Sequence, residues 1–300
     1  MDKDLFGNEI ENIPQIMVFH DESGSISSDR LFYTGLLWIK KEHINLLYNE
    51  LQEYRKSENY YGEIHYSDFP KLFNGEHGAK ARVGKNWYLL WLGKWAKQCW
   101  FSCLIIDTQN KSYDHSRFDY NFHAYNRFTA MAVKAGLSWN SFSADKITLS
   151  IISDQKDRRK QGYIADGIDN DNFEEYLVKR IIKDTLDYKG PDVEIDKPIN
   201  CLNCKDKGPY SLEEELLQLN DLILGSIKSA TEAVSKQETK IWFGKETAEL
   251  IEDTRLKPWE QKFGLYKRFS ISYFPDFKGQ CYNNGEIKMK QKEDINLFDG

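Results

Sequence analysis

Three aspartates stand in apolar surroundings where a charged side chain is out of place. Asp21 and Asp154 each end a short apolar segment, and Asp221 lies within a leucine-rich one. A carboxylate at the last position of a buried strand reaches the carboxyl edge of the sheet, where open α/β folds place their ligands. An ionised carboxylate with little water around it needs a partner, and a divalent cation is a common one. These positions therefore predict a metal site.

Each of these acids also has a local, structural explanation. Asp and Gly favour turns, so Asp21 could simply begin the turn that follows it. Asp221 could lie on a partly exposed polar stripe with Gln218 and Asn220. Gln218 is three residues from Asp221 and shares its helix face, so it could instead support a site there. Glu22 points away from Asp21 on an extended segment, which leaves Glu22 a supporting role at most.

Glu63 is the fourth acidic candidate, because it lies on a short segment that we expect to be extended. His65 would lie on the same face and support the site, or serve only the local structure. Asp21, Glu63, Asp154 and Asp221 together offer the hard oxygen ligands that Mg²⁺ or Mn²⁺ prefers. Two such ions about 4 Å apart can activate water and stabilise the leaving oxygen of a phosphodiester. Our leading hypothesis is a metal-dependent nuclease in which Asp21 bridges the ions.

A run of basic residues follows Asp154 closely. The formal net charge of −6 argues against tight, charge-driven binding to nucleic acid over the whole surface. A local basic run could still contact phosphates and position a strand of DNA or RNA without reading its sequence. The alternative is a solvated loop. The basic residues in question are Lys156, Arg158, Arg159 and Lys160.

The composition is that of a soluble globular chain, with 300 residues, 29% charged residues and 14% aromatic residues. No apolar run approaches the roughly 20 residues that span a bilayer, so we expect no membrane segment. The acidic, polar first residues do not form a secretory signal, and we expect a cytoplasmic protein. Cys201 and Cys204 have the spacing of half a zinc site without a second pair, so ordinary reduced thiols are favoured.

Alternating strand and helix patterns predict an α/β or α+β fold that begins with an antiparallel hairpin. We expect one domain over residues 1–235, with residues 236–300 as a C-terminal extension packed on it. Asp107 also ends a predicted strand, and we interpret it as a strand cap. Strands are predicted at 16–21, 31–39, 100–107 and 147–154, helices at 41–56, 86–97, 118–135, 173–186 and 211–227, and loops at 74–84 and 190–208.

Four features together resemble the DUF3800 family. Residues 20–24 (HDESG) look like its opening strand and turn, and residues 62–65 (GEIH) look like its Glu-hydrophobic-Lys segment. The strand that ends at Asp154 looks like the one that carries its later Asp, and residues 217–225 (LQLNDLILG) look like its late acidic helix. His65 stands where the family usually has Lys, and Asn220 where it usually has a small residue.

This resemblance covers roughly residues 16–228, and it implies a ribonuclease H-like mixed sheet flanked by helices. It also implies an acidic metal site and a nuclease. Members of the family are often found in mobile elements and in antiphage defence, where a partner protein of the defence system is expected.

The competing hypothesis is a non-catalytic interaction or sensor module. Aromatic residues near the C-terminus, Trp242, Phe243 and Trp259, are candidates for an exposed protein-binding surface. Other aromatics could stack on unpaired bases, although burial in the core is the more frequent outcome. These are Tyr60, Tyr61 and Trp87.

Overall fold

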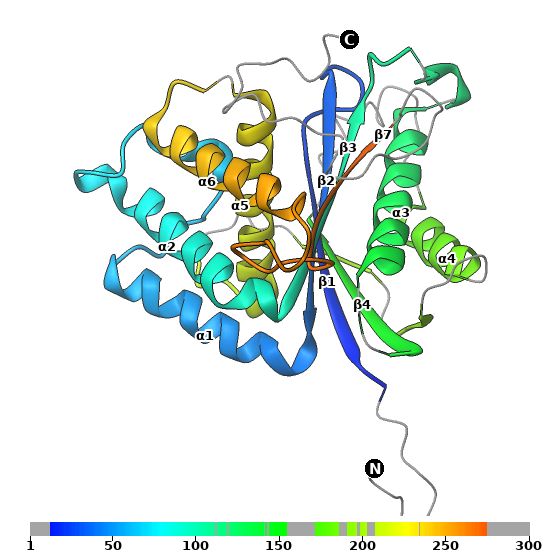
Figure 1. Ribbon diagram of the computed structural model, residues 1–300, viewed down its shortest axis with the longest axis horizontal. Helices are drawn as coiled ribbons and strands as arrows, with labels where there is room; N and C mark the ends of the chain where they lie inside the picture. Colours follow the sequence, from blue (N-terminus) through cyan, green and yellow to red (C-terminus); the bar gives the residue numbers. More distant parts are fainter. Residues whose placement is uncertain are drawn as a thin grey trace, which may run out of the picture.

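The computed structural model shows one mixed sheet with helices on both faces (Figure 1). None of its helices combines the length and the apolar character that crossing a bilayer requires, among the residues described. The structure describes residues 13–111, 113–118, 120–140, 142, 144–154, 172–185, 191–196, 199–202, 208–233 and 235–274.

The sheet has the strand order β5-β4-β1-β2-β3-β7, and β6 also pairs with β4. β2 is antiparallel to β1 and β3, whereas the other described pairs are parallel. The strands are β1 (Gln15–Ser23), β2 (Leu31–Lys40), β3 (Cys99–Asp107), β4 (Lys146–Asp154), β5 (Asp192–Ile195), β6 (Asn200–Leu202) and β7 (Phe269–Phe274).

Helices α1, α2, α5 and α6 cover one face of the sheet, and α3 and α4 cover the other (Figure 1). Each layer encloses its own apolar core against the sheet. The helices are α1 (Lys41–Ser57), α2 (Ala79–Gly93), α3 (Asn121–Trp139), α4 (Phe173–Thr185), α5 (Leu212–Glu232) and α6 (Glu238–Thr254), and the 3₁₀ turns are η1 (Tyr66–Asp68), η2 (Glu76–Gly78), η3 (Trp95–Lys97) and η4 (His115–Arg117).

Side chains along the central strands alternate between the two cores, as the period of a strand requires. Phe19 of β1 and Ile152 of β4 belong to the core beneath α5. Val18 and Ile151 belong to the core beneath α3. The residues two positions after Phe19 and Ile152, which are the candidate acids of these strands, therefore face α5.

Helix α5 lies close against the centre of the sheet. It begins with a capping box, in which Ser211 Oγ accepts from the Glu214 N–H and the Glu214 carboxylate accepts from the Ser211 N–H. Gly35 of β2 lets the helix approach, because a Cβ atom there would be 2.9 Å from Leu224 Cδ1. Asn220 Nδ2 donates to the Gly35 carbonyl at 3.2 Å, so this residue is buried and not part of an exposed stripe.

The predicted α/β class is confirmed, with a mixed sheet flanked by helices, and so is the leading hairpin. Two predicted loops are wrong in part. The segment 74–84 contains the start of α2 at Ala79, and the segment 190–208 contains β5 and β6. Beyond residue 235, α6 packs on α5 and β7 pairs with β3.

Candidate functional site

Asp21 and Asp154 end two neighbouring parallel strands. The register pairs His20 of β1 with Ser153 of β4. Asp21 and Asp154 follow these two residues, so they lie side by side at the carboxyl edge of the sheet. Both side chains belong to the face covered by α5. Asp21 is only 7% exposed, which makes it a carboxylate with little access to water.

The environment of Asp21 opposes its ionisation. Burial is the largest cause that raises the pKa of Asp21 well above its ordinary value, and the charges of Asp154, Asp221 and Glu22 raise it further. The N–H of Glu22, which donates to Asp21 Oδ1 at 2.7 Å, lowers this pKa. The charges of Asp154 and Asp221, which the sequence groups with Asp21 in one candidate site, thus act on Asp21 in the structure.

Asp221 also fixes the segment that carries Glu63. Its Oδ2 accepts from the Tyr66 N–H at 2.7 Å, and Gln218 Oε1 accepts from the Ile64 N–H at 2.7 Å. One turn further along α5, the Tyr66 ring lies against Gly225, where a Cβ atom would be 2.3 Å from the ring carbons. Residues at helical spacing on α5 therefore dock this segment.

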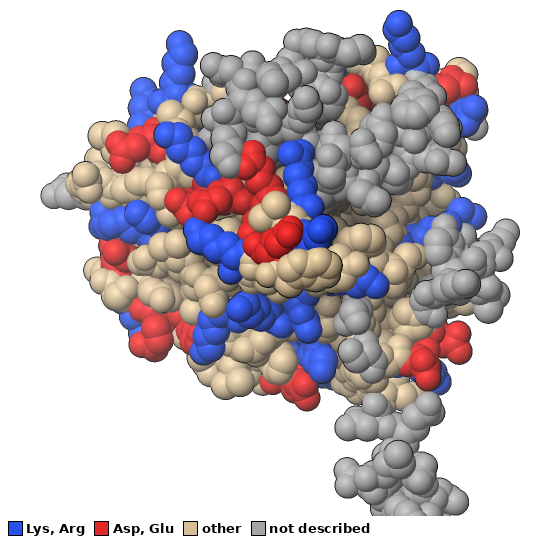
Figure 2. Space-filling view, viewed as in Figure 1, with Lys and Arg blue, Asp and Glu red and all other residues tan. Residues whose placement is uncertain are grey.

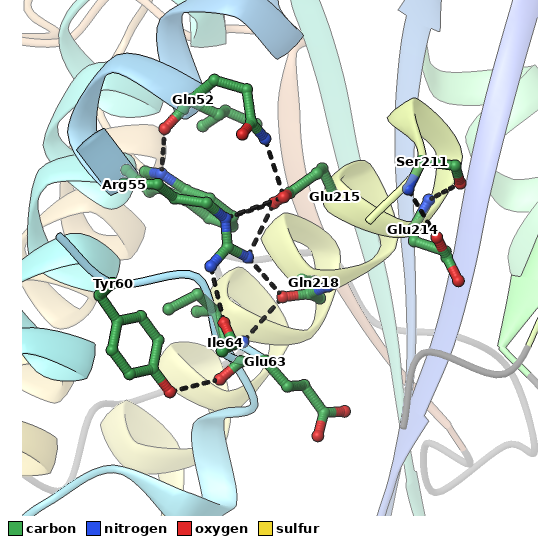
Figure 3. A network of polar contacts seen from close by, with 12 residues as sticks. Gln52, Arg55, Tyr60, Glu63, Ile64, Ser211, Glu214, Glu215 and Gln218 are labelled. Carbon is green, nitrogen blue, oxygen red and sulfur yellow. Dashed lines mark hydrogen bonds and ion pairs between the residues drawn. The ribbon is translucent and has the colours of Figure 1, made fainter. Parts of the chain in front are cut away.

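A buried cation, Arg55, also holds this segment (Figure 3). Arg55 forms an ion pair with Glu215, at 2.8 Å from its Nε to Oε1, and both side chains are 1% exposed. Arg55 also donates to Gln218 Oε1 at 2.9 Å and to the Gly62 carbonyl at 2.6 Å. Figure 3 shows the Glu63 carboxylate pointing away from this network, so the network positions Glu63 without neutralising it.

Glu63 belongs to the same electrostatic neighbourhood as Asp221. Burial is the largest cause that raises the pKa of Glu63, and Asp68 and Asp221 raise it further. His65 and Lys80 lower it. Because Asp221 raises the pKa of both Asp21 and Glu63, it links the strand-end acids to Glu63.

Lys80, in the first turn of α2, is a candidate that the sequence analysis missed. Its side chain is 14% exposed, and its Nζ lies 4.0 Å from Asp68 Oδ2. Burial lowers the pKa of Lys80, whereas Asp68, Glu63 and Asp221 raise it. No local pattern marks this lysine, because it stands in a stretch that the glycines led us to predict as a loop.

Lys240 of α6 is a second lysine in this neighbourhood. Its Nζ donates to the Ser67 carbonyl at 2.9 Å. Burial lowers the pKa of Lys240, and Asp68 and Asp221 raise it. Lysines from two helices thus border the acidic group.

The remaining candidates take different positions. Glu22 accepts from the Tyr125 hydroxyl of α3 at 2.8 Å, on the opposite face of the sheet from Asp21. The His65 ring bonds Ser67 Oγ at 2.6 Å, near Asp68.

Asp107 lies two strands from β1. It accepts from the Tyr273 hydroxyl of β7 at 2.9 Å, and Arg30 Nε lies 3.5 Å from its Oδ1. These contacts agree with the strand cap that the sequence predicts.

Two predictions fall wholly or partly outside the described residues. The basic run Lys156, Arg158, Arg159 and Lys160 lies outside them, and so does Cys204. Within the described part of the chain, no three His, Cys, Asp or Glu side chains lie close enough together to hold a metal ion as they stand. Like-charged carboxylates repel one another and stay apart when no cation lies between them. Binding of a metal ion would therefore require the acidic side chains to move toward the ion.

No protein-family model matches the chain, and no curated protein matches it. The chemistry of the site therefore follows from its own residues: four acids from β1, β4, α5 and the 62–68 segment, with lysines beside them.

Proposed function

We propose that the protein is a divalent-metal-dependent nuclease that hydrolyses phosphodiester bonds of DNA or RNA. One observation carries the proposal. Carboxylates that are distant in the sequence gather on one side of the sheet's carboxyl edge, where burial and mutual repulsion raise the pKa of Asp21. Acids whose pKa is strongly raised by burial and by specific neighbouring charges cluster at functional sites. The carboxylates are Asp21, Glu63, Asp154 and Asp221.

The donor set fits Mg²⁺ or Mn²⁺. It consists of carboxylate oxygens, which are the ligands that these hard cations prefer. When bound, such an ion activates water and stabilises the charge that develops on phosphate oxygens. Arg55 and Gln218 would keep the backbone of Glu63 in place, so that only its side chain has to adjust. Asp221 is held through the Tyr66 N–H.

Lys80 and Lys240 would serve the substrate. A lysine ammonium group is a point charge that binds a phosphate, and both lysines lie within electrostatic reach of Asp221. They would attract the phosphodiester toward the acids, whose own charge would otherwise repel it. The basic run 156–160 remains a proposed contact for the nucleic-acid backbone.

The mixed sheet, with β2 antiparallel to its neighbours, supports the ribonuclease H-like architecture that we propose. The DUF3800 resemblance adds support, since Gln218, Asp221 and Gly225 of its late helix contact the Glu63 segment. From the resemblance we also propose a role in antiphage defence or in a mobile element, alongside a partner protein. The polar N-terminal residues, which do not form a secretory signal, support a cytoplasmic location.

The decisive experiment measures Mg²⁺ and Mn²⁺ binding by calorimetry and cleavage of labelled DNA and RNA. The double variant Asp21→Asn with Asp154→Asn should lose metal binding and cleavage while remaining folded. Asp107→Asn is the matched control, because it changes a strand-end aspartate whose partners are Tyr273 and Arg30. Cleavage that survives in the double variant would refute the proposal.

Lysine variants separate substrate binding from metal binding. Lys80→Met should slow cleavage by about tenfold or more, since a charge-assisted contact is worth roughly 1.5–3 kcal/mol. It should leave metal binding intact or tighter, because one competing cation is gone. Lys85→Met is its control on the same helix, because Lys85 lies over the Phe73 and Trp242 rings. Equal effects of the two variants would exclude the role of Lys80.

Only part of the aromatic surface proposed for an interaction module is exposed. Phe243 is fully buried, so the expectation that it is exposed is wrong. Trp242 is partly buried and packs edge-on against Phe73 and Tyr88. Trp259, at 78% exposed, is the remaining candidate. Intact folding with no metal binding in the wild type would favour this alternative.

A further inference from the structure

A cavity opens between α3 and α4, on the face of the sheet opposite the acidic group. Its volume is about 520 Å³, within the range of sites for small molecules. It is built from η4, the first half of α3 and the start of α4. The lining residues are Arg117, Phe118, Phe122, His123, Asn126, Arg127, Asn172 and Tyr176.

The described lining of this cavity contains two arginines and a histidine but no acidic residue, in a chain of net charge −6. Arg127 is exposed and forms no ion pair with another described residue. Arg117 shares its charge with Asp114, at 3.2 Å from Nε to Oδ2. A guanidinium group matches the oxygens of a phosphate in geometry as well as in charge. The cavity therefore suits an anion.

The walls of the cavity are aromatic and held in place by further rings. Phe118 packs on Phe128, with ring centroids 5.8 Å apart, and Phe122 stacks on Tyr120 at 5.3 Å. Tyr176 of α4 is half-buried on the other side. Aromatic side chains stack on nucleic-acid bases whatever their sequence.

Two amide side chains, Asn126 and Asn172, complete the lining. The guanidinium groups and rings around this cavity match the parts of a nucleotide, which are its phosphate and its planar base.

From this chemistry we infer that the cavity binds a nucleotide unit, with its phosphate on Arg117 and Arg127 and its base against the aromatic wall. The unit belongs to a single-stranded nucleic acid or to a free nucleotide. Tyr125, the neighbour of Asn126 on α3, donates to Glu22, the neighbour of Asp21, so the helix that lines the cavity also contacts the strand that carries Asp21. Binding here does not depend on cleavage at those acids.

The test uses the full chain in buffer with excess EDTA, so that metal-dependent cleavage plays no part. Fluorescence anisotropy measures binding of a short labelled single strand, and calorimetry measures binding of AMP. The variant Arg117→Gln with Arg127→Gln should weaken binding by about tenfold or more. If a strand is bound, the slope of log K against log salt should also become shallower, by about 0.7 for each phosphate that the variant no longer neutralises.

The matched control is Lys41→Gln with Lys146→Gln, which removes the same charge at the opposite edge of the sheet. A reduction of affinity confined to the arginine variant supports the site. A reduction for the strand alone identifies a polynucleotide ligand, and a reduction for AMP as well identifies a free nucleotide. Equal affinities of wild type and arginine variant, or equal reductions in both variants, would overturn the inference whether or not Asp21 supports cleavage.

Discussion

The carboxylate of Asp21 lies in a position that favours its neutral form. Burial, together with the charges of Asp154 and Asp221, raises its pKa, so ionisation of Asp21 costs folding free energy unless a cation is present. An aspartate in unfolded chains has a pKa of about 3.9. Between that value and its raised pKa, the folded protein binds more protons than the unfolded chain.

Replacing Asp21 with Asn should therefore stabilise the metal-free protein. The stability of the wild type falls as pH rises through this window, and it stays lower above the folded pKa, whereas the variant does not show this decrease. The variant should gain about 1–3 kcal/mol near neutral pH, with a smaller gain in mild acid. Urea denaturation in EDTA at about pH 5 and about pH 8 measures the difference. A gain that does not depend on pH, or a decrease in stability, would contradict the assignment.

Metal should offset this difference in stability. Saturating Mg²⁺ stabilises only a protein that binds it, by about 2.7 kcal/mol at a concentration one hundred times the dissociation constant. The wild type should gain this increment, and Asp21→Asn should not.

At the residue scale, the strand-end acids could be predicted because a strand that ends at an aspartate places it at the sheet edge. Lys80 could not, because its proximity to Glu63 and Asp221 depends on how α2 packs and not on its neighbours in sequence. Asp107 shows that an aspartate at a strand end does not by itself identify a site residue. It also ends a strand, yet its partners are Tyr273 and Arg30.

Helix α5 positions the site through residues at helical spacing. Gln218 and Asp221 accept from backbone N–H groups of the Glu63 segment, and Gly225 leaves room for the Tyr66 ring. The Tyr66 hydroxyl then donates to Ser229 at 2.7 Å. One face of one helix thus binds the whole segment.

Gly225→Ala should disrupt this packing. A Cβ atom there would lie 2.3 Å from Tyr66, and the resulting overpacking should cost about 1–3 kcal/mol despite the higher helix propensity of Ala. Metal binding should also weaken, because Glu63 moves with its segment. Gly93→Ala at the end of α2 is the control, since no atom lies within 4 Å of its Cβ. Chemical denaturation of both variants measures the free energy of unfolding, and calorimetry measures their metal binding. Matched stabilities would show that the segment adapts freely.

At the element scale, the predicted strands and most helices follow from apolar periodicity, but glycines misled the prediction near α2. Gly84 lies inside that helix, where a Cβ atom would be 2.4 Å from Phe69 Cζ, so this glycine serves packing and does not break the helix. Strands β5 and β6 are only 4 and 3 residues long, and pairing with β4 defines them. The packing of Gly84 and the pairing of β5 and β6 both depend on residues distant in the sequence, so local patterns do not predict them.

At the scale of the whole molecule, the two proposed sites lie on opposite faces of the sheet in a three-layer sandwich. The acidic group lies beneath α5, and the cationic cavity lies between α3 and α4 across the sheet. Elsewhere the charges are mixed. Figure 2 shows acidic side chains grouped over α6 and the segment after it, with Lys and Arg around them. Lys262 pairs with Glu249 there at 2.6 Å. The local arrangement of charge therefore tells more about ligands than the net charge does.

The last strand, β7, and helix α6 pack into the same sheet and core as the elements before residue 235. β7 pairs with β3 over the register from Phe101 with Phe269 to Ile106 with Phe274. Phe243 and Leu250 of α6 are fully buried in the core beneath α5. Each such side chain contributes roughly 1.5–3 kcal/mol, and several together are comparable to a domain's total stability of about 5–15 kcal/mol.

A chain that ends after residue 235 should therefore fail to fold cooperatively, because it exposes the edge of β3 and the apolar surface that α6 covers. A chain that ends after residue 274 keeps every described element, and it should melt in one transition close to that of the full chain. Solubility, circular dichroism and thermal melting compare the two. If the shorter chain unfolds cooperatively near the same temperature, α6 and β7 are an appendage to the sheet. If it does not, they belong to the unit that holds the acids in place.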